Sequence, residues 1–123
     1  MSTRKILIVD DNPNMSNLLS DILEIFDYEG THAENGKDAL DRLRQSDYDM
    51  VFTDLRMPQM DGYDLLEAIK NEHPTMPVVV VTGYATGDAR ETELSRKADG
   101  FLHKPFKVDE IESILSNLLG MAG

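Results

Sequence analysis

Short apolar runs rich in β-branched residues alternate along the chain with longer stretches whose apolar residues recur at helical spacing. The runs Ile6 to Val9 and Val78 to Val81 are apolar throughout, as expected for strands buried on both faces of a sheet. Such alternation predicts an α/β domain in which crossover helices connect parallel strands. We expect five strands, at residues 5–9, 30–33, 50–53, 77–82 and 100–103.

Five helices are expected between and after these strands. The clearest begins with Asn12 as its N-cap and Pro13 at its first position, followed by an apolar stripe at Met15, Leu18, Leu19, Ile22 and Phe26. A second firm stripe lies near the C-terminus, at Ile111, Ile114, Leu115, Leu118 and Leu119. Shorter stripes occur at Ala39, Leu40 and Leu43 and at Leu65, Leu66 and Ile69. Residues 85–96 contain few large apolar side chains, which predicts the least stably packed helix.

The composition narrows the class of protein. With 123 residues and 41% hydrophobic content, the chain is expected to form one domain at residues 1–119, with a tail or linker stump at 120–123. The net charge of −11 disfavours direct binding to the nucleic-acid backbone. The first apolar run is too short for a signal peptide or membrane span, and the chain has no cysteine. The cytoplasm is therefore the expected location, without membrane insertion.

Charged and hydroxyl side chains follow the predicted strands at the edge where ligands bind to open parallel sheets. Asp10 and Asp11 follow the first strand, Asp54 the third and Lys104 the fifth, while Thr82 ends the fourth. Each residue taken singly has an ordinary structural explanation, such as a helix cap, a turn or a solvated surface charge. Together they predict a cluster of carboxylates that needs a cation.

Magnesium is the cation that best suits this cluster. It prefers oxygen ligands and commonly takes one or two carboxylates together with water and phosphate oxygens. The three histidines, His32, His73 and His103, are scattered along a chain without cysteine, which disfavours a zinc site.

Four segments of the sequence resemble the receiver domain of two-component response regulators, in chemotaxis-regulator-like form, over nearly the entire chain. Ile6-Leu-Ile-Val-Asp10-Asp11-Asn12 is similar to that family's first strand and acidic pair. Val51-Phe-Thr-Asp54-Leu-Arg-Met57-Pro58-Gln-Met60-Asp61-Gly62 resembles its phosphoacceptor strand and loop. The remaining segments are Val79-Val-Val-Thr82-Gly83 and Ala98-Asp-Gly-Phe101-Leu-His-Lys104-Pro105-Phe106.

The resemblance implies a flavodoxin-like, three-layer fold with strand order 2-1-3-4-5, and a role for each matching residue. Asp54 would be the phosphoacceptor, and Thr82 and Lys104 would hold phosphoryl oxygens. Mg²⁺ would be bound directly by Asp11, Asp54 and the Arg56 carbonyl, and by Asp10 through water. Thr82 and Phe101 would form the switch, and the Lys104–Pro105 peptide would be cis.

The same resemblance implies a phosphorylation-dependent signalling switch rather than an enzyme with an external substrate. Its catalysis would be limited to its own phosphorylation and slow dephosphorylation. The donor would be a histidine kinase or a phosphotransfer protein. An output domain or partner would read the surface formed by the fourth helix, fifth strand and fifth helix, and a phosphorylation-dependent homodimer could use the same surface.

Two other classes of protein fit the sequence less well. A magnesium-dependent phosphatase of the haloacid dehalogenase type also uses an aspartate nucleophile, but it has a second acid two residues later after its first strand. Here Asp10-Asp11-Asn12 lacks that spacing. A flavodoxin-like nucleotide binder would have a Gly/Ser/Thr-rich phosphate loop where this chain has two negative charges.

Overall fold

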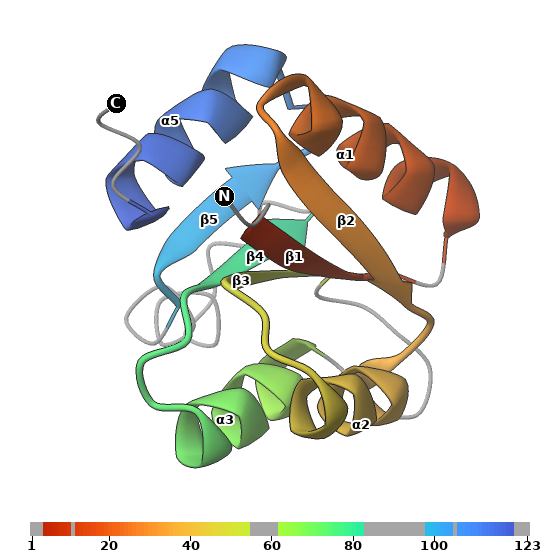
Figure 1. Ribbon diagram of the computed structural model, residues 1–123, viewed down its shortest axis with the longest axis vertical. Coiled ribbons are helices and arrows are strands. Elements are labelled where there is room, and N and C mark those ends of the chain that lie inside the picture. Colours follow the sequence, from red (N-terminus) through yellow and green to blue (C-terminus); the bar gives the residue numbers. More distant parts are fainter. Residues whose placement is uncertain (1–3, 11, 55–61, 83–97, 105, 120–123) are drawn as a thin grey trace.

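A parallel five-stranded sheet forms the centre of the protein, seen in a computed structural model that describes residues 4–10, 12–54, 62–82, 98–104 and 106–119. The strand order is β2-β1-β3-β4-β5, as the resemblance to the receiver family implies (Figure 1). The strands are β1 Arg4–Val9, β2 Tyr28–Ala33, β3 Met50–Asp54, β4 Val78–Thr82 and β5 Gly100–His103.

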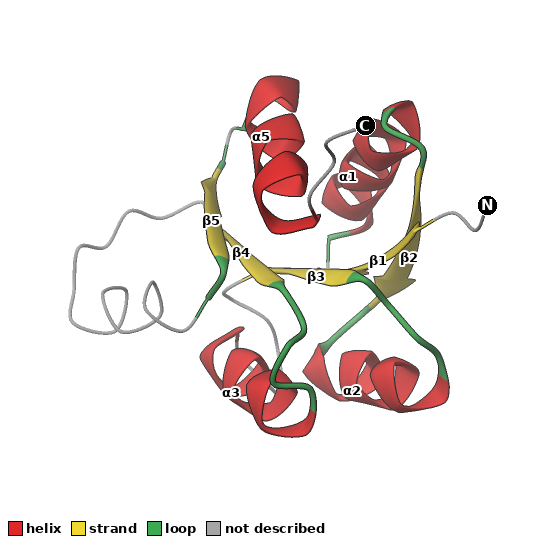
Figure 2. Cartoon of the chain, turned by 60° about the vertical axis from the view of Figure 1, so that its left-hand side comes forward, coloured by secondary structure: helices red, strands yellow, loops and turns green. Residues whose placement is uncertain are grey.

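Helices cover both faces of this sheet and give the three layers visible in Figure 2. One face carries α1 (Pro13–Ile25) and α5 (Val108–Leu119), and the other carries α2 (Gly36–Gln45) and α3 (Gly62–Glu72). The helix predicted at residues 85–96 lies outside the described residues. None of the helices in the described part of the chain is long and apolar enough to span a membrane.

The sheet separates two hydrophobic clusters, and both are built from alternate residues of the same strands. Leu7, Val9, Val51, Val78 and Val80 face α2 and α3, whereas Ile6, Ile8, Phe52, Val79 and Val81 face α1 and α5. β1 is fully buried from Ile6 to Val9. A strand that is apolar on both faces has this environment, so packing on both sides of the sheet holds the carboxyl ends of β1 and β3 rigidly.

The first helix follows its sequence signals at its start, but its buried face differs from the prediction. Asn12 is the N-cap and accepts a hydrogen bond from the Asn14 backbone N–H at 3.0 Å. Leu18, which the predicted stripe included, is 47% exposed, and the buried face comprises Ser16, Leu19, Ile22 and Leu23. The inclusion of Leu18 was wrong because this residue lies at the margin of the face that meets the sheet.

Gly30 lies inside β2 and does not mark its start, because the strand begins two residues earlier at Tyr28. A Cβ atom at Gly30 would lie 3.0 Å from Ser20 Oγ and 3.3 Å from Ser20 Cα. The missing side chain therefore lets α1 approach the edge strand closely.

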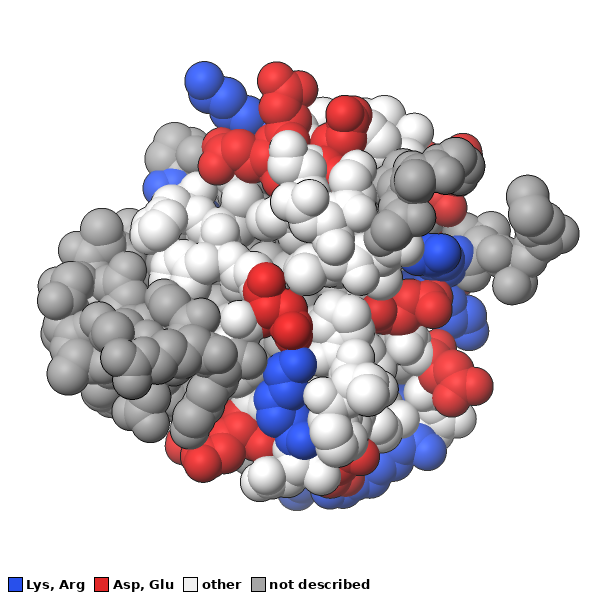
Figure 3. Space-filling view, turned by 90° about the vertical axis from the view of Figure 1, so that its left-hand side faces the viewer, with Lys and Arg blue, Asp and Glu red and all other residues white. Residues whose placement is uncertain are grey.

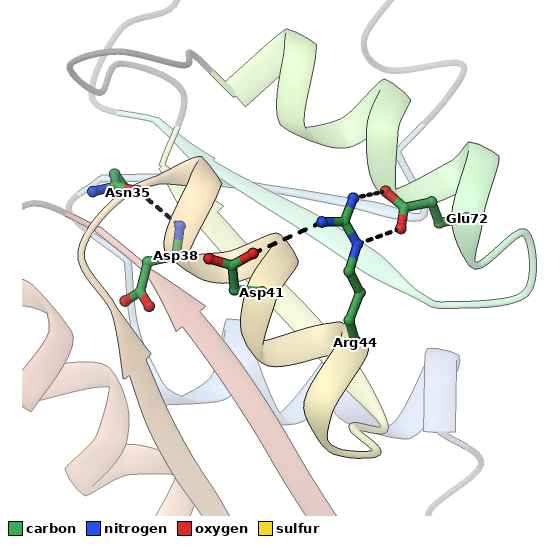
Figure 4. Close-up of polar contacts among 5 residues, drawn as sticks. All are labelled: Asn35, Asp38, Asp41, Arg44 and Glu72. Atoms are coloured by element: carbon green, nitrogen blue, oxygen red, sulfur yellow. Dashed lines mark hydrogen bonds and ion pairs between the residues drawn. The ribbon is translucent and has the colours of Figure 1, made fainter.

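An ion pair joins α2 to α3 on the other face of the sheet. Arg44 donates two hydrogen bonds to the Glu72 carboxylate, from Nε at 2.8 Å and from Nη2 at 2.9 Å (Figure 4). Arg44 also lies 3.7 Å from Asp41 on its own helix. The hydrogen bonds from Arg44 lower the pKa of the Glu72 carboxyl below its ordinary value, and the positive charge of Arg44 acts in the same direction.

The Arg44–Glu72 ion pair predicts that the stability of the folded protein depends on pH. The pKa of Glu72 is lowered in the folded protein. At pH values above the ordinary glutamate pKa, the ion pair therefore contributes fully to the free energy of unfolding, and this contribution is lost as pH falls through the lowered pKa. Glu72→Gln should therefore destabilise the protein slightly at neutral pH, and the difference from wild type should shrink in acid. Urea unfolding over a pH series measures this difference, and a constant difference would contradict the assignment.

Candidate functional site

Asp10 stands at the carboxyl end of β1, where the buried strand gives way to the connection to α1. Its backbone N–H extends the β1–β2 ladder by donating to the Ala33 carbonyl at 3.2 Å. Its carboxylate oxygen Oδ1 accepts a hydrogen bond from the Asn12 backbone N–H at 2.8 Å. The side chain is only 3% exposed, so a carboxylate is held in a nearly dry position by its own strand and the loop that follows.

Asp54 is the last residue of β3, which pairs with β1 on one side and β4 on the other. The preceding Phe52 and Thr53 are each 1% exposed, and the Thr53 hydroxyl donates to the Asp54 carbonyl at 3.0 Å. The Asp54 side chain is 14% exposed. The strand therefore fixes the backbone of Asp54, while its carboxylate remains partly accessible to a reactant.

Lys104 follows β5 directly and brings a positive charge to both acids, although β4 lies between β5 and β3. Its Nζ lies 3.7 Å from Asp10 Oδ2 and 3.8 Å from Asp54 Oδ1. The Lys104 side chain is 22% exposed. Residues separated by up to 94 positions in the sequence thus form one site at the carboxyl edge of the sheet.

The switch residues are described only in part. Thr82 is the final residue of β4 and pairs with His103 of β5, while its side chain is not described. Phe101 is partly buried, packs against the cluster on the α2–α3 face, and has its ring centroid 4.9 Å from that of His103. Asp11, Arg56 and Pro105 lie outside the described residues, so their predicted roles and the predicted cis peptide stay predictions.

The carboxylates of Asp10 and Asp54 are suitable ligands for magnesium. Both carboxylates lie within 3.8 Å of the same ammonium, so they border a common space, and carboxylate oxygens are the ligands that Mg²⁺ prefers. Across the described ranges, no group of three or more acidic, histidine or cysteine side chains could hold a metal alone. Asp10 and Asp54 would therefore supply part of a magnesium site, with the remaining oxygens from elsewhere in the chain, water or phosphate.

A cavity of about 380 Å³ adjoins the site on the β2 side. It is lined by Asp10 itself and by Pro13, Ser16, His32, Ala33, Glu34 and Asn35. Asp10 thus borders this cavity as well as the space that it shares with Lys104.

Two supporting contacts were not among the sequence predictions. The Asn12 N–H bond to Asp10 could have been anticipated from the Asp-x-Asn spacing, since an aspartate often accepts from the backbone two residues later. Lys70 donates to Asp99 Oδ2 at 2.5 Å and to the Met76 carbonyl at 2.8 Å, which ties α3 to the start of β5. These residues lie 29 positions apart, and no local pattern indicates their contact.

Comparison with known proteins identifies the family of this fold and site. The family model described as the response regulator receiver domain matches residues 6–116. The chain therefore belongs to the response regulator receiver domain family, whose members are phosphorylation-dependent switches in two-component signalling. This membership agrees with the flavodoxin-like strand order and does not support the phosphatase alternative.

Several curated relatives share this domain. The chain is 35% identical to the transcriptional regulatory protein ZraR of Klebsiella oxytoca over 114 residues, which cover 93% of this chain and 26% of ZraR. It is 38% identical to the sensor histidine kinase RcsC of Escherichia coli over 111 residues, which cover 90% of this chain and 12% of RcsC. The chain thus spans only a small part of the length of these relatives.

Solved structures show the same architecture. The response regulator TrrA of Thermotoga maritima, in complex with Mg²⁺-BeF, aligns with a TM-score of 0.86 and 32% identity over 94% of this chain and 99% of that chain. A CheY-like receiver domain from Methanospirillum hungatei also aligns with a TM-score of 0.86, at 31% identity, over 97% of this chain and 96% of that chain.

The position of Lys104 predicts an electrostatic role before any ligand binds. Lys104→Met should destabilise the metal-free protein by about 1–2 kcal/mol, because two largely buried carboxylates lose a shared cation. Lys107→Met, at an exposed position three residues later, is the matched control and should be near neutral. Urea unfolding in chelator measures both changes. Equal midpoints for the two variants would contradict this role, and added Mg²⁺ should reduce the deficit of Lys104→Met.

Proposed function

We propose that Asp54 accepts a phosphoryl group from a histidine kinase or a phosphotransfer protein, and that Mg²⁺ is the required cofactor. The observation that carries the proposal is the convergence of Asp10, Asp54 and Lys104 at the carboxyl edge of the sheet. Within this cluster Asp54 has the more exposed of the two described carboxylates, at 14% against 3% for Asp10. It is therefore the acid that an incoming phosphorus atom can reach.

The reaction is a transfer between two high-energy linkages. A carboxylate oxygen of Asp54 attacks phosphorus and forms the P–O bond of an acyl phosphate, while the P–N bond of the donor phosphohistidine breaks. The electron pair of that bond leaves with the imidazole. When acetyl phosphate is the donor, a P–O bond breaks and acetate leaves instead.

The surrounding charges decide whether this attack can occur, because an anionic nucleophile approaches an anionic phosphoryl group. Lys104 would turn its ammonium from the carboxylates to the phosphoryl oxygens, with Thr82 donating its hydroxyl to the same group. Asp11, Asp54 and the Arg56 carbonyl would hold the metal directly, and Asp10 would hold it through water. Bound Mg²⁺ supplies charge neutralisation at the phosphoryl oxygens.

Phosphorylation would be transmitted through Thr82 and Phe101. If the Thr82 hydroxyl moves toward the phosphoryl group, it leaves volume that the Phe101 ring can enter, and such packing changes are two-state events that reach the surface. The responding surface would comprise residues 85–96, β5 and α5. On the face shown in Figure 3, the described part carries uncharged surface interrupted near its centre by an acidic and a basic side chain, a mixture that suits contact with a protein partner.

The partner that reads this surface would be an output domain or a second copy of the chain. Because the curated relatives are several times longer than this chain, the output could lie in the same polypeptide. Residues 1–119 would form the switch and 120–123 the tail or linker. Its catalysis would be confined to itself, as phosphoryl uptake and slow hydrolysis. A cytoplasmic location would suit a kinase donor and a chain without cysteine.

Labelling by a small phosphodonor tests the assignment of Asp54. With acetyl phosphate and Mg²⁺, the protein should gain one phosphoryl group by intact mass spectrometry, and Asp54→Asn should gain none. Asp47→Asn, which changes an exposed carboxylate before β3, is the matched control and should label like wild type. Full labelling of Asp54→Asn, or labelling that survives complete chelation of divalent metal, would refute the proposal.

A further inference from the structure

The backbone of β5 is fixed at its start by contacts that leave little room for the strand to slide. Asp99 Oδ2 accepts hydrogen bonds from Lys70 Nζ at 2.5 Å and from the Val78 N–H at 2.9 Å, while the Asp99 N–H donates to the Val78 carbonyl at 2.9 Å. At Gly100 an added Cβ would lie 3.2 Å from Val79 Cγ2. A change at Phe101, the next residue, is therefore accommodated more readily by rotation of its side chain than by movement of the strand.

The Phe101 ring has an aromatic neighbour that belongs to the same strand. Phe101 and His103 are two positions apart in β5, so both side chains project from the same face. Their ring centroids are 4.9 Å apart and the ring planes are inclined at 45°. This distance lies in the range in which aromatic pairs attract one another.

His103 also lies between Phe101 and Lys104 in the sequence. It pairs with Thr82 in the β4–β5 register, and it directly precedes Lys104, whose ammonium lies near both carboxylates. Its side chain is exposed, so packing in the core does not account for the presence of a ring at this position.

We infer that His103 is a positioning residue that holds the Phe101 ring in its unphosphorylated orientation and so sets how readily the switch moves. This inference rests on the proposed phosphorylation of Asp54. A contact that is made in one of two states and lost in the other reduces affinity for whatever binds the second state. Removing the imidazole should therefore favour binding of a phosphoryl mimic.

The test measures beryllofluoride affinity, with saturating Mg²⁺, for wild type, His103→Ala and His103→Phe. An exposed aromatic pair changes such an equilibrium by about two- to fivefold, so His103→Ala should bind the mimic that much more tightly. His103→Phe keeps a ring beside Phe101 and should bind like wild type. Thermal unfolding of the three free proteins shows whether each variant is folded.

A second measurement follows Phe101 directly. In the ligand-free His103→Ala variant, the χ1 rotamer populations of Phe101, measured from three-bond scalar couplings, should move part of the way toward those of the mimic-bound wild type. Couplings are measured because loss of the imidazole ring current shifts the Phe101 ring resonances even when the ring does not turn.

Unchanged or weaker affinity in His103→Ala, or the same change in His103→Ala and His103→Phe, would overturn the inference. Those results leave the proposed function intact as long as wild type binds the mimic. If wild type does not bind beryllofluoride in the presence of Mg²⁺, the proposed function fails, and the role of His103 in switching fails with it.

Discussion

The proposed function of this domain depends on the charge balance among Asp10, Asp54 and Lys104. Two carboxylates enclosed to this degree repel each other unless a cation lies between them, and in the ligand-free protein the Lys104 ammonium is that cation, at 3.7 and 3.8 Å. Under the proposed function the same repulsion would favour Mg²⁺ binding, and Lys104 would be available to a phosphoryl group once the metal neutralises the carboxylates. The stability of the metal-free protein and the proposed phosphoryl transfer would then depend on the same three side chains.

The sheet supplies the precision that this balance requires. Asp10 and Asp54 end neighbouring strands whose preceding residues are fully buried, so packing on both faces of the sheet fixes their backbones. Lys104 is fixed less directly, through β5, which Lys70 and Asp99 tie to α3 and β4. β5 is therefore held at its start and leads through Phe101 and His103 to Lys104. These are the residues that would respond to a phosphoryl group under the proposed function.

Much of the fold and site could be predicted from sequence because the signals are local. The acids at the strand ends follow from the alternating pattern and the strand order from the family resemblance, and Asp10, Asp54 and Lys104 meet as expected. The start of β2 could not be predicted, because glycine is a common turn residue. Here Gly30 lies inside the strand, where its lack of a side chain lets Ser20 of α1 pack closely against it. Likewise the exposure of Leu18 depends on how α1 is rotated against the sheet, which periodicity alone does not determine.

Chemical trapping of the phosphorylated residue tests the central claim most directly. Borohydride reduces an acyl phosphate to an alcohol, so an aspartyl phosphate becomes homoserine at the position that carried the phosphoryl group. Protein treated with acetyl phosphate and Mg²⁺, reduced in this way and sequenced by peptide mass spectrometry, should contain homoserine at position 54 and nowhere else. Homoserine at position 10 instead, or a phosphoryl group on a histidine with position 54 unchanged, would contradict the account.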